Sequence, residues 1–361
     1  MNDKGAIVHV CEALGGGVLR VIQALADATA ELGVETAVVH GRRPETPPSL
    51  EGVFDARVRV VEVPGWGDRS PSGAAAMLRA CSDVNRELRR HARGVLHLHS
   101  TFAGIVGRLL PAHGHEILYT PHAYVFLNPA VSPRVRSAAR LAERALSRRG
   151  RTIACSQSEA TVARGLTSPS NVVVIPNGID VTALPPPQPE PQDDFVVGCV
   201  GRAVYQRRPD AVATIAATIG RGFDGRFVWF GDGPFREALT GAGVEVTGWL
   251  AEAEAARAYG YSNVVLHLSA FEGLPIALLE AMAAARPIVA TDLPAIRDVV
   301  GDSALLVSTE EAAIGAIRSL RGDPALRERL GSSGRDRVQK RFTRKAMVER
   351  TLAVYSRSVA L

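Results

Sequence analysis

The feature of this 361-residue sequence that most restricts its fold is a repeated alternation of short β-branched runs and longer amphipathic runs. Residues 6–11 are rich in valine and isoleucine, and residues 18–32 then repeat apolar side chains at helical spacing. The alternation continues to residue 176 and resumes at residue 195. Such a pattern builds parallel sheets with helices on both faces, so the sequence predicts an α/β fold.

A proline-rich stretch divides this alternation into two halves. Residues 184–194 read LPPPQPEPQDD, and such a run favours extended backbone and cannot continue a helix or a central strand. We therefore expect two doubly wound, Rossmann-like domains at 1–182 and 195–342, joined by a linker at 183–194 and facing each other across a ligand cleft. The amphipathic tail 343–361 is expected to form a helix that packs back on the N-terminal domain.

Composition and charge exclude several classes of protein. The chain has 46% hydrophobic and 22% charged residues, which is typical of a globular protein. Its four cysteines are far apart and form no C-x-x-C, which argues against a disulfide scaffold or a structural zinc. The net charge of +5 is too small to indicate nucleic-acid binding. Without a long apolar run or a signal-peptide pattern, a cytoplasmic location is expected.

The densest group of candidate site residues is SAFEGLPIALLEAMA, residues 269–283. A predicted strand ends at its start, where parallel sheets bind ligands, and Gly273 allows a tight turn. Pro275 suits the first position of a helix, whose N-terminal amides favour an anion such as a diphosphate. Glu272 precedes that helix, and Glu280 lies inside it among apolar residues, where a carboxylate needs hydrogen-bond donors. Ligand hydroxyls could supply them, but so could a structural arginine.

A second group follows the first strand of the C-terminal half, in VGRAVYQRRP, residues 200–209. Guanidinium groups grip phosphate oxygens through paired hydrogen bonds, so Arg202 and Arg207 are candidates for binding a diphosphate. A solvated run of charges is the alternative interpretation.

Glycines and histidines mark candidate sites in the N-terminal half. Residues 15–17 are all glycine and follow the first strand, so this loop, with Gly16 and Gly17 among its candidate residues, allows a ligand close to the backbone. They do not form G-x-G-x-x-G, and no acid follows the second strand, which argues against a nicotinamide-dependent dehydrogenase. His122 lies at another strand end and could contact a substrate hydroxyl. His97 and His99 share one strand face, but no third metal ligand is apparent, which favours core packing.

Taken together, these groups resemble the retaining GT-B glycosyltransferases of family GT4, especially those of polysaccharide biosynthesis. The resemblance covers nearly the whole chain and rests on motifs in the family's order: HLHSTFAGIVG at 97–107, YTPH at 119–122, IPNGID at 175–180, VGR at 200–202, FGDGP at 230–234, GW at 248–249 and the Glu272/Glu280 pair.

The resemblance implies roles for individual residues. Glu272 and His122 would contact the donor sugar, and Glu280 would bind the ribose of the nucleotide. Arg202 and Arg207 would hold the diphosphate, with Arg207 where the family often has lysine. The remaining donor-binding positions implied by the resemblance are Gly16 and Gly17, which would close over the phosphates, and Gly273, Leu274 and Ile276. No cofactor and no obligatory metal are implied.

The chain also departs from the family. The E-G-F-G form of the acidic motif is replaced by Glu272-Gly-Leu-Pro275, so one backbone donor is lost and different sugar contacts are expected. The resemblance implies retaining transfer of a hexose-type sugar from a nucleotide-diphosphate sugar to a glycan or lipid-linked acceptor in bacterial surface polysaccharide synthesis. Alternatives are a GT-B nucleotide-sugar epimerase, glycosylation of a small natural product, and a silent nucleotide-sugar-binding protein.

A stripe of arginines bears on the acceptor. Arg136, Arg140, Arg144 and Arg148 repeat every four residues along one predicted helix. Such a stripe attracts anionic lipid, so peripheral contact with the inner face of the cell membrane is expected. An ordinary solvated helix remains the alternative.

Overall fold

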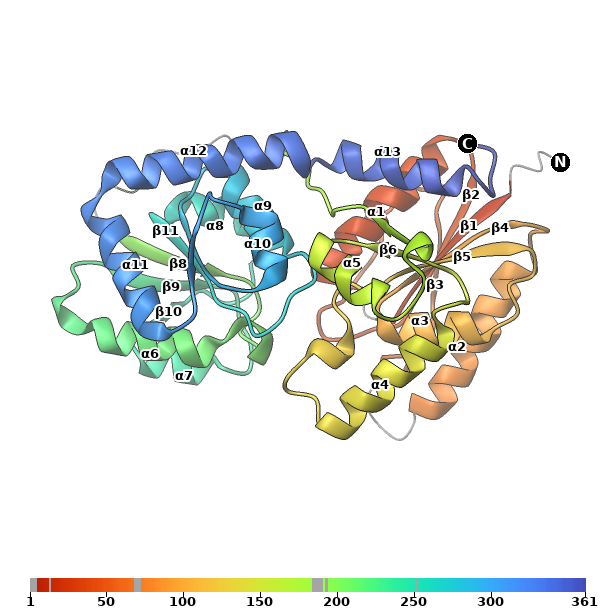
Figure 1. The fold of residues 1–361 in the computed structure, drawn as a ribbon, viewed down its shortest axis with the longest axis horizontal. Coiled ribbons are helices and arrows are strands. Elements are labelled where there is room, and N and C mark those ends of the chain that lie inside the picture. The colour runs from red at the N-terminus through yellow and green to blue at the C-terminus, as the bar shows by residue number, and fades with distance from the viewer. Residues whose placement is uncertain (1–4, 13, 68–72, 184–190, 192–193, 251) are drawn as a thin grey trace. The chain divides into compact units, whose positions relative to one another are not determined.

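The computed structural model describes residues 5–12, 14–67, 73–183, 191, 194–250 and 252–361 (Figure 1). The chain forms two compact units. Unit 1 comprises Met1–Leu127, Val131–Asn177 and Arg344–Leu361, and unit 2 comprises Asn128–Ala130 and Gly178–Thr343. The expected boundaries at 182 and 342 therefore differ from the observed ones by a few residues. Most of the predicted linker, 184–190 and 192–193, lies outside the described residues.

Unit 1 is built on a seven-stranded parallel sheet in the order β3-β2-β1-β4-β5-β6-β7. The two central strands are buried along their whole length, as expected for a sheet covered on both faces. The strands are β1 (Ala6–Cys11), β2 (Glu35–His40), β3 (Arg59–Glu62), β4 (Gly94–His99), β5 (His115–Thr120), β6 (Arg151–Ala154) and β7 (Val172–Val174).

Alternate side chains of β1 point to two different cores in unit 1. Val8 and Val10 pack with residues of α2 and α3, whereas Ile7 packs with residues of α1 and α13. The C-terminal helix thus completes one face of the sheet to which the first strand belongs. The helices of unit 1 are α1 (Gly16–Glu31), α2 (Gly73–Leu88), α3 (Thr101–Leu109), η1 (Val125–Leu127), α4 (Pro133–Leu146), α5 (Gln157–Arg164), η2 (Pro169–Asn171) and α13 (Arg344–Tyr355).

Unit 2 repeats this architecture with a six-stranded parallel sheet in the order β10-β9-β8-β11-β12-β13. Its strands are β8 (Val196–Val200), β9 (Arg226–Phe230), β10 (Glu245–Val246), β11 (Val264–His267), β12 (Ile288–Thr291) and β13 (Leu305–Val307). Its helices are η3 (Tyr205–Arg207), α6 (Pro209–Ile219), η4 (Gly220–Gly222), α7 (Arg236–Gly241), α8 (Glu252–Ala258), η5 (Tyr259–Tyr261), α9 (Ile276–Ala283), α10 (Pro294–Val300), α11 (Glu310–Gly322) and α12 (Pro324–Arg341).

Each sheet has a point where the order of the strands reverses. In unit 1 the chain extends from β1 to one side through β2 and β3 and then crosses to β4 on the other side. In unit 2 the same reversal falls between β8 and β11. Open parallel sheets bind ligands outside the carboxyl ends of the strands at such points. The topology therefore gives one candidate binding edge in each unit, and the doubly wound α/β prediction is confirmed.

The structure corrects several local predictions. Helices α5, α7 and α10 were not expected, and Pro275 is the N-cap of α9 rather than its first helical residue. Within the residues that the structure describes, no helix combines the length and apolarity needed to cross a bilayer.

Candidate functional site

The candidate site of unit 2 lies where β8 and β11 end side by side. The turn after β8 carries Arg207, in the short helix η3, and β11 ends at His267. Nη1 of Arg207 lies 3.1 Å from Oε1 of Glu272 and 2.6 Å from Nε2 of His267. The strand reversal thus brings together an arginine and a glutamate that are 65 residues apart in the sequence.

Two further side chains fix the carboxylate of Glu272. Ser269 Oγ donates to Oε1 at 2.7 Å, and Gln206 Nε2 donates to Oε2 at 3.3 Å. Gln206 also donates to the backbone oxygen of Phe271 at 3.2 Å, so the turn after β8 is tied directly to the loop before α9. The predicted pair Arg207 and Glu272 is therefore preorganised, whereas Gln206, Ser269 and His267 were missed by the sequence analysis.

The carboxylate of Glu272 and the guanidinium of Arg207 compensate each other's charge in this site. Burial raises the pKa of Glu272, but the charge of Arg207, the contact with His267 and the hydrogen bond from Ser269 outweigh it, so the net pKa lies below its usual value. Burial and the neighbouring guanidinium lower the pKa of His267 to about 4. At neutral pH the site thus holds one guanidinium, one carboxylate and a neutral imidazole.

Glu280 lies in α9 and is buried, as are most residues of that helix. The hydroxyl of Tyr259 donates to its Oε2 at 2.9 Å. The expected partner of this carboxylate was a ligand hydroxyl or an arginine, and the tyrosine was not anticipated. The hydrogen bond satisfies part of the acceptor capacity of a group that is costly to bury.

The other predicted residues of unit 2 surround the start of α9. The predicted donor-binding residues Gly273, Leu274 and Ile276 are all buried in the unliganded structure. No side chain caps the first turn of α9. Arg202 is half-buried and follows Gly201, the residue directly after β8.

Unit 1 has a second candidate site at the reversal between β1 and β4. Ser100 Oγ donates a hydrogen bond to Oε2 of Glu12, and the guanidinium of Arg43 lies 3.5 Å from Oε1. Glu12 is 4% exposed, and burial raises its pKa despite these partners. Ser100 has φ 75° and ψ 165°, a region that non-glycine residues rarely adopt. Such strain is typical of functional sites, and the sequence analysis missed all three residues.

The glycine loop lies beside Glu12, at the start of α1. Gly16 has φ +51° and nothing within 4 Å of an added Cβ, whereas a Cβ on Gly15 would lie 2.5 Å from the backbone oxygen of Glu45. Close packing therefore accounts for Gly15, which the sequence analysis had included in the loop expected to approach a ligand. No side chain caps the helix, so its N-terminal amides remain available to an anion.

His122 follows β5 in a turn of unusual conformation. His122 and Ala123 have φ values of 51° and 82°. Glu159 holds the turn, because its carboxylate accepts the N–H of Ala123 and the N–H of Cys155, both at 2.8 Å. Nε2 of His122 lies 3.1 Å from Nδ1 of His99. The contact with buried His99 thus fixes the imidazole of His122 at the carboxyl edge of the sheet.

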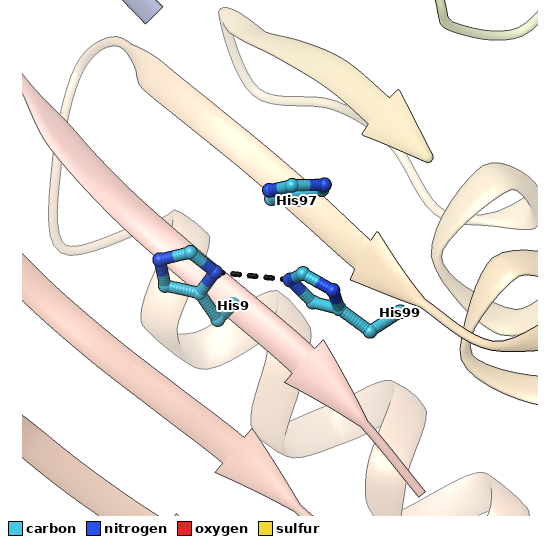
Figure 2. A group of neighbouring side chains, drawn as sticks. All are labelled: His9, His97 and His99. Atoms are coloured by element: carbon cyan, nitrogen blue, oxygen red, sulfur yellow. Dashed lines mark hydrogen bonds between the residues drawn. The ribbon is translucent and has the colours of Figure 1, made fainter. Parts of the chain in front are cut away.

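His99 belongs to a buried histidine cluster whose third member the sequence analysis did not find. His9 on β1 lies opposite His97 on β4, and its Nδ1 is 3.1 Å from Nε2 of His99 (Figure 2). One nitrogen from each of His9, His97 and His99 lies within 4.8 Å of the others. The statement that no third potential ligand accompanies His97 and His99 was therefore wrong, because parallel pairing brings it from a distant strand.

Hydrogen bonds within the cluster already engage most of these nitrogens. His97 Nδ1 lies 2.6 Å from the hydroxyl of Tyr355, and its Nε2 lies 2.9 Å from Oγ1 of Thr120. Burial lowers the pKa of His9 to about 3 and those of His97 and His99 well below 6.5. The rings are therefore neutral, as metal ligands must be, but a metal ion would have to displace existing hydrogen bonds.

The two sites offer complementary chemistry. Unit 2 presents a guanidinium held by a carboxylate, beside an uncapped helix start, which suits a phosphate group and sugar hydroxyls. Unit 1 presents a buried carboxylate, a strained serine and an anchored imidazole, which suit hydroxyl groups. The structure joins Arg207 to Glu272 and places Gly16, Gly17 and His122 in unit 1.

Comparison with known families gives two matches that together span most of the chain. Residues 15–183 match the model described as Glycosyltransferase Family 4, and residues 194–323 match the model described as Glycosyl transferases group 1.

Among curated relatives, the alpha-maltose-1-phosphate synthase of Mycolicibacterium smegmatis is 28% identical over 331 residues, covering 80% of this chain and 84% of that protein. The lipopolysaccharide core biosynthesis glycosyltransferase LpsD of Rhizobium meliloti is 32% identical over 183 residues. That match covers 47% of this chain and 52%, about half, of the relative.

Solved structures show the same fold over the full length. The Anabaena protein HepE, in a complex with UDP-glucose, superposes with a TM-score of 0.77 and 16% sequence identity, covering 98% of this chain and 99% of that one.

Proposed function

We propose that this chain, which belongs to glycosyltransferase family 4 and has the GT-B fold, moves a hexose-type sugar from a nucleotide-diphosphate sugar to a glycan or lipid-linked acceptor. The matches to both family models support glycosyltransferase activity. The donor class, the stereochemical outcome and the role in surface polysaccharide synthesis are parts of the proposal. They draw support from a lipopolysaccharide enzyme among the relatives and a UDP-glucose complex among the structural neighbours.

The observation that carries the proposal is the contact between Arg207 and Glu272 at the strand reversal of unit 2. A diphosphate needs cationic donors that are already oriented, and Glu272 with His267 orients the guanidinium before any ligand arrives. Arg202, from the same turn, supplies a second guanidinium. The carboxylate of Glu272 is then the acceptor for donor-sugar hydroxyls.

We propose further that transfer retains the configuration of the sugar and forms no covalent adduct with the enzyme. The departing nucleotide diphosphate is stabilised by Arg202, Arg207 and the N-terminal amides of α9, and a phosphate oxygen takes the proton of the acceptor hydroxyl. Neutralisation by guanidinium groups makes a metal ion dispensable in this scheme. Glu280 binds the nucleotide ribose, and His122 contacts the sugar.

The proposal includes peripheral contact with an anionic membrane. On α4, Arg140 and Arg144 are exposed, as are the apolar side chains of Val135 and Leu141. Guanidinium groups interleaved with exposed apolar side chains suit the headgroup region of a bilayer. A lipid-linked acceptor would be reached there from the cytoplasmic side.

The experiment is a panel of UDP-, GDP- and dTDP-sugars, incubated with and without a lipid-linked sugar acceptor, with nucleotide release and donor identity both followed. We expect release from one donor that rises with acceptor, and a product with the donor's anomeric configuration. Conversion of the donor without acceptor would identify an epimerase instead. Binding without release under every condition would identify a silent nucleotide-sugar-binding protein.

A further inference from the structure

A hollow of about 750 Å³ lies on unit 1, at the end of its sheet opposite to Glu12 and His122. Helix α4 starts after β5 and ends before β6, and α5 starts after β6 and ends before β7, so both helices end at the amino edge of the parallel sheet. Glu12 and His122 follow strands and lie at the carboxyl edge. The hollow is lined by Arg144, Ala145, Ser147, Arg148, Arg164, Gly165, Leu166, Thr167, Ser168 and Asn171.

All charged side chains that line this hollow are positive. Arg144, Arg148 and Arg164 contribute three guanidinium groups, and no carboxylate is among the lining residues. Within the described part of the chain, none of the three guanidinium groups has an ion pair or a hydrogen bond. Like charges gathered around one hollow repel one another. The unliganded hollow is therefore electrostatically unfavourable.

The acidic residues of α4 and α5 are buried and do not line the hollow, so they do not neutralise its arginines. The single acid of α4 is Glu143, which is 1% exposed and pairs with the buried Arg108 at 2.7 Å. The single acid of α5 is Glu159, which is 3% exposed and binds backbone N–H groups. The outer faces of both helices therefore carry cations without neighbouring carboxylates.

Attraction to the C-terminal ends of helices accounts for two of the three arginines only. Arg144 and Arg164 lie in the last turns of α4 and α5, where a cation is favoured by the exposed carbonyls. Arg148 lies beyond the end of α4, and the nearby carbonyls are already engaged. Ser147 Oγ donates to the carbonyl of Arg144 at 2.8 Å, and Thr167 Oγ1 donates to the carbonyl of Ser147 at 3.2 Å.

We propose that this hollow binds a phosphate group, carried either by a soluble ligand or by a lipid headgroup. Guanidinium groups present paired N–H donors that match two phosphate oxygens, and three arginines line this hollow, from α4, from α5 and from the turn after α4. This anion site uses no residue of the donor site in unit 2, and where the phosphate is a lipid headgroup it deepens, and rests on, the membrane contact proposed for Arg144 on α4.

The test compares two double variants that lose the same charge. R144A/R164A removes two guanidinium groups from the hollow, and R318A/R329A removes two exposed ones from α11 and α12 of unit 2, outside it. Inorganic phosphate binding is measured by calorimetry at low ionic strength. Vesicle binding is measured by flotation with phosphatidylcholine, alone and mixed equally with phosphatidylglycerol. All four residues are on the surface, so both variants should fold, and thermal unfolding checks this.

We expect the hollow variant to lose phosphate affinity by about tenfold or more, because charge-assisted hydrogen bonds are removed, while the control variant keeps it. Selective loss of phosphate binding identifies a soluble ligand. Selective loss of binding to the anionic vesicles alone identifies a lipid headgroup. Equal loss in both variants, or no binding by the wild-type chain in either assay, overturns the proposal.

Discussion

Nη1 of Arg207 is shared between Oε1 of Glu272, at 3.1 Å, and the imidazole of His267, at 2.6 Å. Because the imidazole is neutral at neutral pH, it adds no charge that would weaken the attraction of the guanidinium for phosphate. The arginine remains cationic and oriented, and its other nitrogens remain for a ligand. This arrangement makes the pair the most sensitive point of the proposed transfer reaction.

Substitution of Glu272 by glutamine should lower kcat by about 10²- to 10³-fold, since an oriented electrostatic contact in the site is lost. R207A should cause a loss of similar size. R208A is the control, because Arg208 pairs with Glu310 at 2.7 Å and should leave turnover nearly unchanged. The rate of nucleotide release is measured for all three variants, and their melting temperatures confirm that they fold. Wild-type turnover in E272Q would remove Glu272 from the mechanism.

The hydrogen bond between Tyr259 and Glu280 makes a separate prediction. Y259F leaves a buried carboxylate oxygen without this donor, which should lower the free energy of unfolding by about 1–3 kcal/mol. The proposed ribose contact of Glu280 should weaken as well, so KM for the donor should rise more than kcat falls. Y261F is the matched control, because Tyr261 is exposed. Urea denaturation and donor titration separate the two effects, and identical stability of Y259F and Y261F would contradict the assignment.

The histidine cluster predicts loss of stability in mild acid. In the folded chain the pKa of His9 lies at about 3, whereas an unfolded histidine titrates near 6.5, so between these values the unfolded state binds more protons. Stability is therefore fully present above about pH 6.5 and declines as the pH falls, by about 1.4 kcal/mol per pH unit for each such ring.

The variant H9L should flatten this decline between about pH 6.5 and pH 5. V10A, at a buried apolar side chain of the same strand, should lower stability at every pH and leave this slope unchanged. Urea denaturation at a series of pH values gives the slopes, and equal slopes for H9L and the wild-type chain would show that His9 does not cause the decline.

The buried ion pair of unit 1 predicts the largest stability effect. Arg108 and Glu143 are 4% and 1% exposed, and Glu143 also accepts the hydroxyl hydrogen of Tyr119 at 2.8 Å. R108A leaves this carboxylate uncompensated and should cost about 3–5 kcal/mol, whereas R108M/E143Q should recover part of that loss. R42A breaks an exposed pair with Glu62 and should have a much smaller effect. Chemical denaturation measures the free energy of unfolding of the three variants. If R108A loses no more of it than R42A does, the expectation is refuted.

The fold could be predicted because strand and helix periodicities are local properties of the sequence, and the chain shows them in both halves. Helix α5 was missed although its signal was present: Ser156 accepts the N–H of Glu159 at 3.1 Å, as in a serine-x-x-glutamate cap. Motif resemblance indicated Arg207 and Glu272, but their contact depends on the strand reversal. His9, Glu12 and Tyr259 belong to no local pattern, since each becomes significant only through a partner brought by the fold.

The return of the C-terminal helix to unit 1 has a consequence for biosynthesis. Met347, Val354 and Tyr355 share a core with Ile7 and Val95, although all of unit 2 lies between them in the chain. A ribosome therefore finishes the second unit before it releases the residues that cover the first. Until then the nascent first unit lacks the tyrosine hydroxyl that contacts His97. A chain shortened by its last 18 residues should consequently be a target for chaperones and proteases, even with every proposed catalytic residue present.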